Sequence, residues 1–349
     1  MAKSGWKENG TVTSRWRSRL ALAAALGAGA HLAAVLAQET PVIRVQVNLV
    51  RVIATVKDTA GKLVGALQRD DFEVYDNGVK QEIAVFERQT EQPLSIALLI
   101  DISGSTNKDL KYETDSATRF LRALLGEGNP RDAVSLFSFN SDVTQLTGYT
   151  HNVALVERFF KTLHGEGGTA LYDAIYLVSE NLEDRQGRKV IVVVTDGGDT
   201  FSAKNDKAAL AAAQLADAVI YPVVVVPITN DAGRNTGGEH VLAFMAERTG
   251  GRTFLPTLGA QLDRAFADII SELRTQYLIG FYPHNTPLTK DPFHRLQVQV
   301  HSPELQVSAR NGYYGEAEGG AAEPDARVSV TPDKTITVAP DRKKKQLNQ

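Results

Sequence analysis

Four apolar runs separated by amphipathic segments restrict the fold of this chain more than any other feature. Each run is apolar on both of its faces, as a strand requires when helices cover both sides of a parallel sheet. The runs are LSIALLI, AVSLFSF, VIVVV and VIYPVVVV, at residues 94–100, 133–139, 190–194 and 219–226. They predict the strands of a doubly wound, mostly parallel sheet.

The segments between these runs carry apolar residues at spacings of three and four, which is the helical period. Such stripes lie at residues 117–125, 155–163, 171–182 and 262–273, and the alanine-rich segment 203–217 is predicted to be helical from its composition. Alternating strands and helices predict an α/β domain over residues 94–275, with helices on both faces of the sheet.

Extended patterns return on both sides of this α/β domain. In residues 42–57, apolar and polar side chains alternate, and the alternation changes phase near Leu49, which indicates a bulge or a strand crossing. The segments 42–92 and 276–315 are each too small to bury a sheet face alone. We therefore expect them to pair as one β-sandwich-like module, split by the inserted domain.

A tight hairpin is expected inside the first β segment. Asn77 and Gly78 are residue types that accept the positive φ angles of a two-residue turn. The predicted arms carry Phe72 and Val74 on one side and Ile83 and Val85 on the other.

The two ends of the chain have different compositions from the domains. Residues 20–37 form an alanine-rich apolar segment after Arg15, Arg17 and Arg19, which predicts a signal peptide over 1–37 with cleavage after Ala37. The alternative is an uncleaved membrane anchor, although alanines and glycines make the segment weakly apolar. Residues 316–349 are rich in Gly, Ala, Pro and charge and are expected to be a disordered tail.

Charge and cysteine content exclude several functions. The first 37 residues hold five basic and one acidic side chain, so the remainder carries 33 basic and 40 acidic side chains. A body with this mildly acidic balance does not predict nucleic-acid binding, which requires a basic face. The chain has no cysteine, which excludes disulfides, thiolate metal sites and thiol nucleophiles.

Carboxylates and hydroxyls gather at the predicted carboxyl ends of the strands, where ligands bind in open α/β sheets. Asp101 ends the first run and is followed by Ser103 and Ser105, Asp196 follows the third run, and a glycine-rich loop delivers Thr169. Two carboxylates and three hydroxyls, all oxygen donors, are typical of a site for a hard divalent cation. Magnesium is the expected ion, with manganese or calcium as alternatives.

These residues resemble a known motif. D-I-S-G-S at 101–105, Thr169 in G-G-T and Asp196 in T-D-G are similar to the metal-ion-dependent adhesion site of von Willebrand factor A (VWA) domains. The resemblance covers about residues 94–275 and implies a Rossmann-like fold, a metal held by these five side chains, and a partner carboxylate that completes the metal's coordination. The segments DNGVKQEIAVFE, YLIGFY and NGYY further resemble a bacterial exported branch of the family.

Each residue of the motif also has a simpler explanation. Thr169 suits a helix cap, and Ser103, Ser105 and the pair Asp196-Gly197 suit turns. Asp199 and Thr200 are candidates for supporting hydrogen bonds, and Asn140 and Asp142 are candidates for the rim of the site. The combination of all five motif residues at strand ends favours the metal site.

Other chemical motifs do not fit their required context. GEGGTA at 165–170 follows a predicted helix rather than a strand, unlike a dinucleotide fingerprint, and Ser103 lacks the first glycine of a nucleophile elbow. His164 is the one histidine near Thr169 that could act as a base. Phosphoryl transfer through Asp101 is a rival, but the hydroxyls that follow it suit a cation better than a phosphate.

The sequence therefore predicts a nonenzymatic, adhesion-type protein-binding module, without catalytic residues. Its partner is expected to be a protein that offers an Asp or Glu carboxylate to the metal. The signal segment places the module outside the cytoplasm, periplasmic or secreted, without a stable membrane span after cleavage. Two alternatives stay open: a magnesium-dependent phosphatase or esterase, and an envelope scaffold in which the ion is only structural.

Overall fold

The computed structural model describes residues 49–88, 92–226, 235–286 and 292–315. The central part is a five-stranded sheet with the strand order β7-β6-β5-β8-β9. Its strands are β5 (Leu94–Asp101), β6 (Ala133–Phe139), β7 (Val143–Gln145), β8 (Arg188–Thr195) and β9 (Ala218–Val224). Only β7 is antiparallel to its neighbour. The sheet confirms the predicted doubly wound α/β class, and the four apolar runs form its parallel strands.

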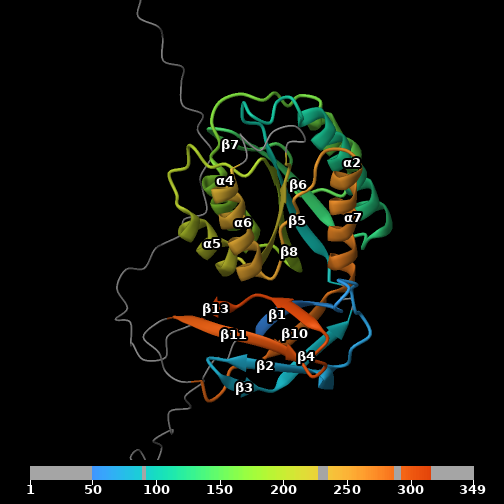
Figure 1. The fold of residues 1–349 in the computed structure, drawn as a ribbon, viewed down its shortest axis with the longest axis vertical. Helices are drawn as coiled ribbons and strands as arrows, with labels where there is room; N and C mark the ends of the chain where they lie inside the picture. The colour runs from blue at the N-terminus through green and yellow to red at the C-terminus, as the bar shows by residue number, and fades with distance from the viewer. Residues whose placement is uncertain (1–48, 89–91, 227–234, 287–291, 316–349) are drawn as a thin grey trace, which may run out of the picture. The chain divides into compact units, whose positions relative to one another are not determined.

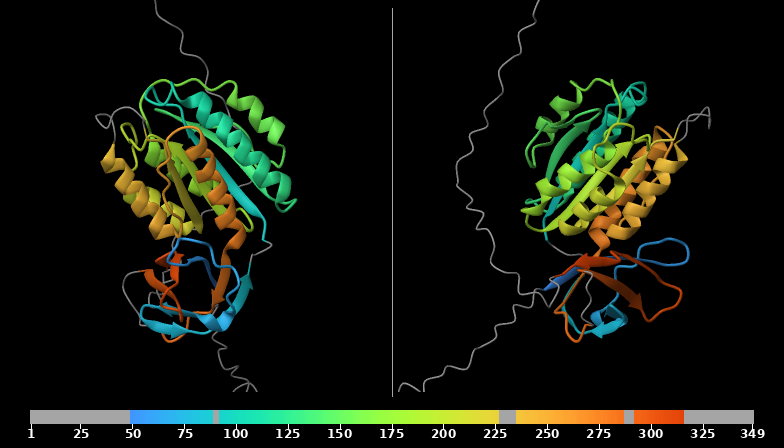
Figure 2. Two further views of the ribbon diagram at one scale, coloured as in Figure 1. Left: turned by 45° about the vertical axis from the view of Figure 1, so that its right-hand side comes forward. Right: turned by 90° about the vertical axis from the view of Figure 1, so that its left-hand side faces the viewer.

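Helices cover both faces of this sheet (Figures 1 and 2). One face packs against α2 (Leu110–Glu127), α3 (Val153–Phe160) and α7 (Ala260–Thr275). The other face packs against α4 (Leu171–Glu183), α5 (Asp206–Leu215) and α6 (Thr236–Thr249). All eight residues of β5 are buried, because this central strand has a helical layer on each side.

The strands outside this domain form two antiparallel sheets around one core. The first has the order β12-β1-β10-β4 and the second has β13-β11-β2-β3. Their bounds are β1 (Val50–Lys57), β2 (Phe72–Asp76), β3 (Val79–Gln81), β4 (Ile83–Arg88), β10 (Tyr277–Phe281), β11 (Phe293–Val300), β12 (Gln306–Ala309) and β13 (Gly312–Tyr314). A short 3-10 helix, η1 (Arg69–Asp71), precedes β2.

Each of these sheets contains strands from both sides of the α/β domain, so the predicted split β module is confirmed. For example, β1 pairs with β10 and β12, and β2 pairs with β11. The proposed domain boundaries at 42–92, 94–275 and 276–315 stay predictions, as do the signal peptide over 1–37 and the tail over 316–349. Those two terminal segments and the strand pattern before Leu49 lie outside the described residues.

The predicted hairpin is correct at its turn and wrong in its second arm. Asn77 and Gly78 have φ angles of 47° and 83°, as a two-residue turn requires. The second arm of the hairpin is β3, however, with Val79 opposite Asp76. After Glu82 the chain enters β4, where Ile83 and Val85 pair with β10 in the other sheet. The chain thus changes sheets, and both sheets contribute to one core.

Two elements in the described part of the α/β domain were not predicted from the sequence. Helix α6 contains Gly237 and Gly238 in its first turn, which lowers its helix propensity. The edge strand β7 is three residues long and mostly exposed, so it has no apolar pattern. In the described parts of the chain, no helix is both long enough and apolar enough to span a membrane.

Candidate metal site

Asp101 is the last residue of the central strand β5, and its side chain is fully buried. Its two carboxylate oxygens each accept a hydrogen bond. Oδ1 accepts from the backbone N–H of Ser103 at 2.8 Å, and Oδ2 accepts from the Thr195 hydroxyl at 2.6 Å. Thr195 ends β8, so this carboxylate joins the ends of two neighbouring parallel strands.

The loop after Asp101 brings two serine hydroxyls together. Ser103 Oγ and Ser105 Oγ are 3.1 Å apart, and Ser103 is buried whereas Ser105 is exposed. The hydroxyl of Thr106 donates to the backbone oxygens of Asp101 and Ser103, which closes the loop. The alternating serines therefore present adjacent oxygen atoms, one inside the protein and one toward solvent.

The loop that carries Thr169 is tied to the serine loop by two backbone hydrogen bonds. Gly104 N–H donates to Gly167 O at 3.1 Å, and Glu166 N–H donates to Ile102 O at 2.8 Å. Gly167 has a φ of 78°, which favours glycine at this close approach. The two loops thus lie against each other at the same edge of the sheet.

Thr169 itself is 4% exposed and is held by the loop that follows Asp196. Its N–H donates to Thr200 Oγ1 at 2.9 Å, and its carbonyl oxygen accepts from the N–H groups of Thr200 and Phe201. Thr200 is therefore a supporting residue. The cap of helix α4 is Ala170 and has no side-chain hydrogen bond, so capping does not account for the Thr169 hydroxyl.

Asp196 follows β8 and is partly exposed. The next residue, Gly197, has a φ of 91° and donates its N–H to Thr195 Oγ1, which turns the chain sharply after the strand. Because Thr195 Oγ1 also donates to Asp101 Oδ2, Asp196 directly follows a residue that contacts the buried carboxylate. The three loops named by the motif are therefore brought to one edge of the sheet.

A buried carboxyl group that the sequence reasoning missed lies beside these residues. Glu113, in the first turn of α2, is 1% exposed, and its Oε2 has no hydrogen-bond partner. Burial, followed by the charges of Asp101, Asp109 and Asp196, raises the pKa of Glu113 to about 8. The sequence did contain a signal, because position 113 lies four residues before Ala117 on the predicted apolar stripe.

The electrostatics of these acids fit a cation. Burial raises the pKa of Asp101 to about 6, and the nearby Asp196 adds to this shift. Buried carboxylates in mutual repulsion, one of them with an orphaned oxygen, are stabilised by a nearby positive charge. The residues present therefore suit a divalent ion. Within the described residues, no group of three His, Cys, Asp or Glu side chains is placed so that it could hold a metal.

Other predicted candidates have identifiable contacts. Asn140, after β6, braces the Thr169 loop because its backbone O accepts from Ala170 N–H. The next residue, Ser141, was not predicted, and its Oγ accepts from Gly168 N–H. Asp199 accepts hydrogen bonds from Ser202 Oγ and Tyr172 N–H, which gives it a structural role. Asp142 and His164 are exposed.

A parallel sheet with helices on both faces and a D-x-S-x-S loop at the end of its central strand defines the class of VWA domains. The comparison with family models agrees, because residues 96–198 match the model of the von Willebrand factor type A domain. The α/β domain of this chain is therefore similar to that family over residues 96–198. A search of curated proteins found no match to the sequence.

Several solved structures are similar to this chain. The vWF domain of the type V pili tip protein Mfa5 from Porphyromonas gingivalis is 15% identical, covers 52% of this chain and 94% of its own, and gives a TM-score of 0.44. BatB from Bacteroides thetaiotaomicron is 19% identical over 52% of this chain and 98% of its own, with a TM-score of 0.40. The PilB minor pilin from Streptococcus sanguinis is 13% identical over 53% of this chain and 62% of its own, with a TM-score of 0.42.

Proposed function

We propose that this chain is an exported, nonenzymatic binding module that captures a carboxylate of a partner protein through a divalent cation. Asp101, Ser103, Ser105, Thr169 and Asp196 hold the ion, which is magnesium or, alternatively, manganese or calcium. The supporting observation is the junction of three loops around buried Asp101, next to the unpaired buried oxygen of Glu113. Export is proposed from the signal-like segment 1–37.

The proposed ligand set explains why an acidic partner is favoured. Three of its five members are neutral hydroxyls, so only the two Asp carboxylates contribute negative charge to the coordination of the ion. A hard cation with few charged ligands binds a further anionic oxygen strongly. Ser105 is exposed and Asp196 is partly exposed, which leaves the solvent side of the site accessible to an incoming carboxylate.

The surroundings of the site supply apolar contact for the same partner. Phe201 is 61% exposed, and its N–H donates to the carbonyl oxygen of Thr169 at 3.0 Å. Tyr112, which precedes Glu113 in α2, is 57% exposed. Aromatic side chains beside a charged contact commonly supply much of the affinity of an interface. We therefore propose that the captured carboxylate is flanked by apolar residues in the partner.

Calorimetric titration with peptides tests the proposal. A panel of short peptides, each with one Glu or Asp flanked by apolar residues, is compared with matched Gln or Asn peptides, in magnesium and in EDTA. We expect the acidic peptides to bind in magnesium but not in EDTA. We also expect the Asp101→Asn variant to lose this magnesium-dependent binding. Asp115→Asn, which removes an exposed carboxylate on α2, is the control. Equal binding of acidic and amide peptides would contradict the proposal.

The same material separates the two alternative functions. On a panel of phosphatase and esterase substrates with magnesium, the wild type is expected to show no more turnover than the Asp101→Asn variant. Turnover by the wild type that the variant lacks would establish a hydrolase. A magnesium-dependent rise in Tm, without binding of any acidic peptide, would support the scaffold in which the ion is only structural.

A further inference from the structure

The edge of the α/β sheet opposite the proposed metal site faces a groove that has no role in the function proposed above. Parallel strands β5, β6 and β8 begin at this edge. An outer cavity of about 1040 Å³ is lined by Arg51 of β1 and Arg131, and an inner cavity of about 250 Å³ is lined by Arg188 and Arg310. Arg51, Gln92, Gln186 and Gly187 line both cavities, so the two cavities adjoin. All of these residues belong to one compact unit of the chain.

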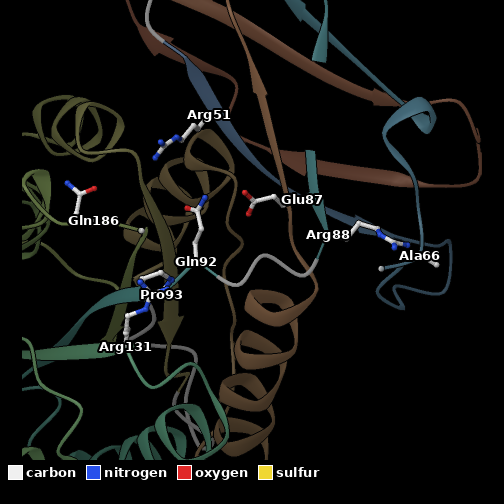
Figure 3. A pocket seen from close by; sticks show the side chains of 10 residues that line it. Arg51, Ala66, Glu87, Arg88, Gln92, Pro93, Arg131 and Gln186 are labelled. Atoms are coloured by element: carbon white, nitrogen blue, oxygen red, sulfur yellow. The ribbon is translucent and has the colours of Figure 1, made fainter. Parts of the chain in front are cut away.

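The groove is basic although the whole chain has a net charge of −3. Its two cavities are lined by seven Arg and Lys side chains and three Asp and Glu side chains. Figure 3 shows Arg51 and Glu87 near Gln92, whereas Arg88 extends away toward Ala66. The positive charge is therefore concentrated toward Arg51 and the inner cavity. A basic concavity of this kind attracts anions.

Arg188 is a buried cation without a carboxylate partner among the described residues. It is 8% exposed, and its Nη1 donates to Leu273 O at 2.5 Å and to Gln276 Oε1 at 3.1 Å. Its Nε has no hydrogen-bond partner. The carbonyl of Leu273 lies near the carboxyl end of α7 and offsets part of the charge. Burial lowers the pKa of Arg188 to about 10, and the charges of Asp132 and Glu87 oppose this shift.

Three further guanidinium groups line the inner cavity. That of Arg185 donates to Ser95 Oγ and lies over the Tyr149 ring, and the other two belong to Arg310 and Arg51. Arg310 has a side chain that is 10% exposed; it pairs with Asp217 and donates to Arg51 O, but its Nε is buried without a partner. Arg51 is exposed, and within the described residues its guanidinium makes no ion pair. Arg51, Arg188 and Arg310 thus reach one cavity from three separate segments of the chain, and Arg188 and Arg310 each have a buried Nε–H without a partner.

We propose that this groove binds the phosphate group of a small polar ligand, with Arg51, Arg188 and Arg310 as its donors. Guanidinium groups from different elements approach a ligand from several directions, which suits a tetrahedral dianion better than a planar monoanion. Gln92, Gln186, Gln214 and Thr249 line the cavities with neutral polar groups that suit a polar ligand body. The phosphate belongs to a soluble molecule or to a lipid headgroup.

Titration calorimetry of the full chain in EDTA tests this proposal independently of the metal site. Inorganic phosphate and glycerol phosphate probe the soluble source, vesicles with phosphatidic acid probe the lipid source, and acetate is the carboxylate control. We expect saturable binding in at least one phosphate arm and none with acetate. Phosphate binding is expected to be the same in Asp101→Asn as in the wild type. A failure to bind phosphate is therefore distinct from a failure of the proposed metal-dependent function.

Two single-residue variants test whether phosphate binds in the groove. Arg51→Gln removes an exposed charge, so it is expected to fold normally and to weaken phosphate binding on the order of tenfold. Arg158→Gln, which removes an exposed charge on α3, is the control and is expected to bind as the wild type does. The absence of saturable phosphate binding, equal affinities of Arg51→Gln and wild type, or binding of acetate alone would overturn the proposal.

Discussion

The hydroxyl of Thr195 donates to Oδ2 of Asp101 at 2.6 Å, across the junction of two parallel strands. Both residues are fully buried. Since Thr195 Oγ1 also accepts from Gly197 N–H, one hydroxyl connects the end of β5 with the turn that carries Asp196. The two carboxylates of the candidate metal site are therefore positioned by a residue outside the motif.

Thr195→Val should destabilise the protein and weaken its metal binding. The substitution keeps the shape of the side chain but leaves Asp101 Oδ2 and Gly197 N–H without this partner, at a cost of about 1–3 kcal/mol. Urea denaturation measures the free energy of unfolding. Thr144→Val, on the exposed edge strand β7, is the control and should change it little. An unchanged free energy in Thr195→Val would show that water replaces the hydroxyl.

Stability without metal should depend on pH through Glu113. Its pKa is about 8 in the folded state and its ordinary value is 4.5, so the folded protein holds a proton that the unfolded chain releases. The free energy of unfolding is therefore expected to fall as pH rises from about 4.5 to 8 and to level off above that range. Asp101, with a pKa of about 6, contributes only to the lower part of this range.

Glu113→Gln isolates this effect. Denaturation in EDTA at pH 6, 7 and 8 should show a flatter pH dependence in the variant than in the wild type, and magnesium should reduce the wild-type slope because a nearby cation stabilises the carboxylate. Asp115→Asn is the control in the same helix. Parallel wild-type and Glu113→Gln profiles would mean that Glu113 does not hold a proton in this range.

Ser105→Ala should weaken magnesium binding without unfolding the protein. Ser105 is exposed, so the loss of its hydroxyl has little effect on the core, whereas the ion loses one proposed oxygen ligand. The measurement is the rise of Tm with magnesium concentration, since a ligand that binds only the folded state stabilises it by mass action. We expect the variant to need a higher magnesium concentration for the same rise. Identical dependence would remove Ser105 from the ligand set.

Phe201→Ala should weaken the binding of acidic peptides and leave metal binding unchanged. Phe201 is 61% exposed beside Thr169, and its proposed role is apolar contact with the partner. A loss of about 1–2 kcal/mol of binding free energy is typical of an aromatic anchor. Leu215→Ala, also at 61% exposure but at the end of α5, is a matched control. Equal peptide affinities in the two variants would contradict the assigned role.

Gly78→Ala and Gly126→Ala should change stability in opposite directions. Gly78 has a φ of 83° in the hairpin turn, where a Cβ costs about 1–2 kcal/mol although no atom lies near it. Gly126 lies in α2 with open space around it, so alanine should stabilise the helix by up to about 1 kcal/mol. The measurement is the Tm of each variant relative to the wild type. A shift of the same sign in both variants would contradict the prediction.

The sequence alone determined the fold class and the members of the motif, for a local physical reason. Runs buried on both faces and stripes at helical spacing report directly how each segment is covered. Asp101, Ser103, Ser105 and Asp196 lie at or just after predictable strand ends, and Thr169 lies in a glycine-rich loop before a predictable helix. The same local reasoning placed the turn at Asn77 and Gly78, because the preferred φ angles of these residues do not depend on distant contacts.

Only the tertiary structure decided how segments distant in the sequence meet. It placed β4 in a different sheet from β3, brought Glu113 toward Asp101 and Asp196, and showed that Thr195 and Thr200 hold the site together. It also placed Arg51, Arg188 and Arg310 around one cavity, although the sequence separates them widely. Burial and the approach of distant charges depend on the packing of the whole chain, and no periodicity within a segment encodes them.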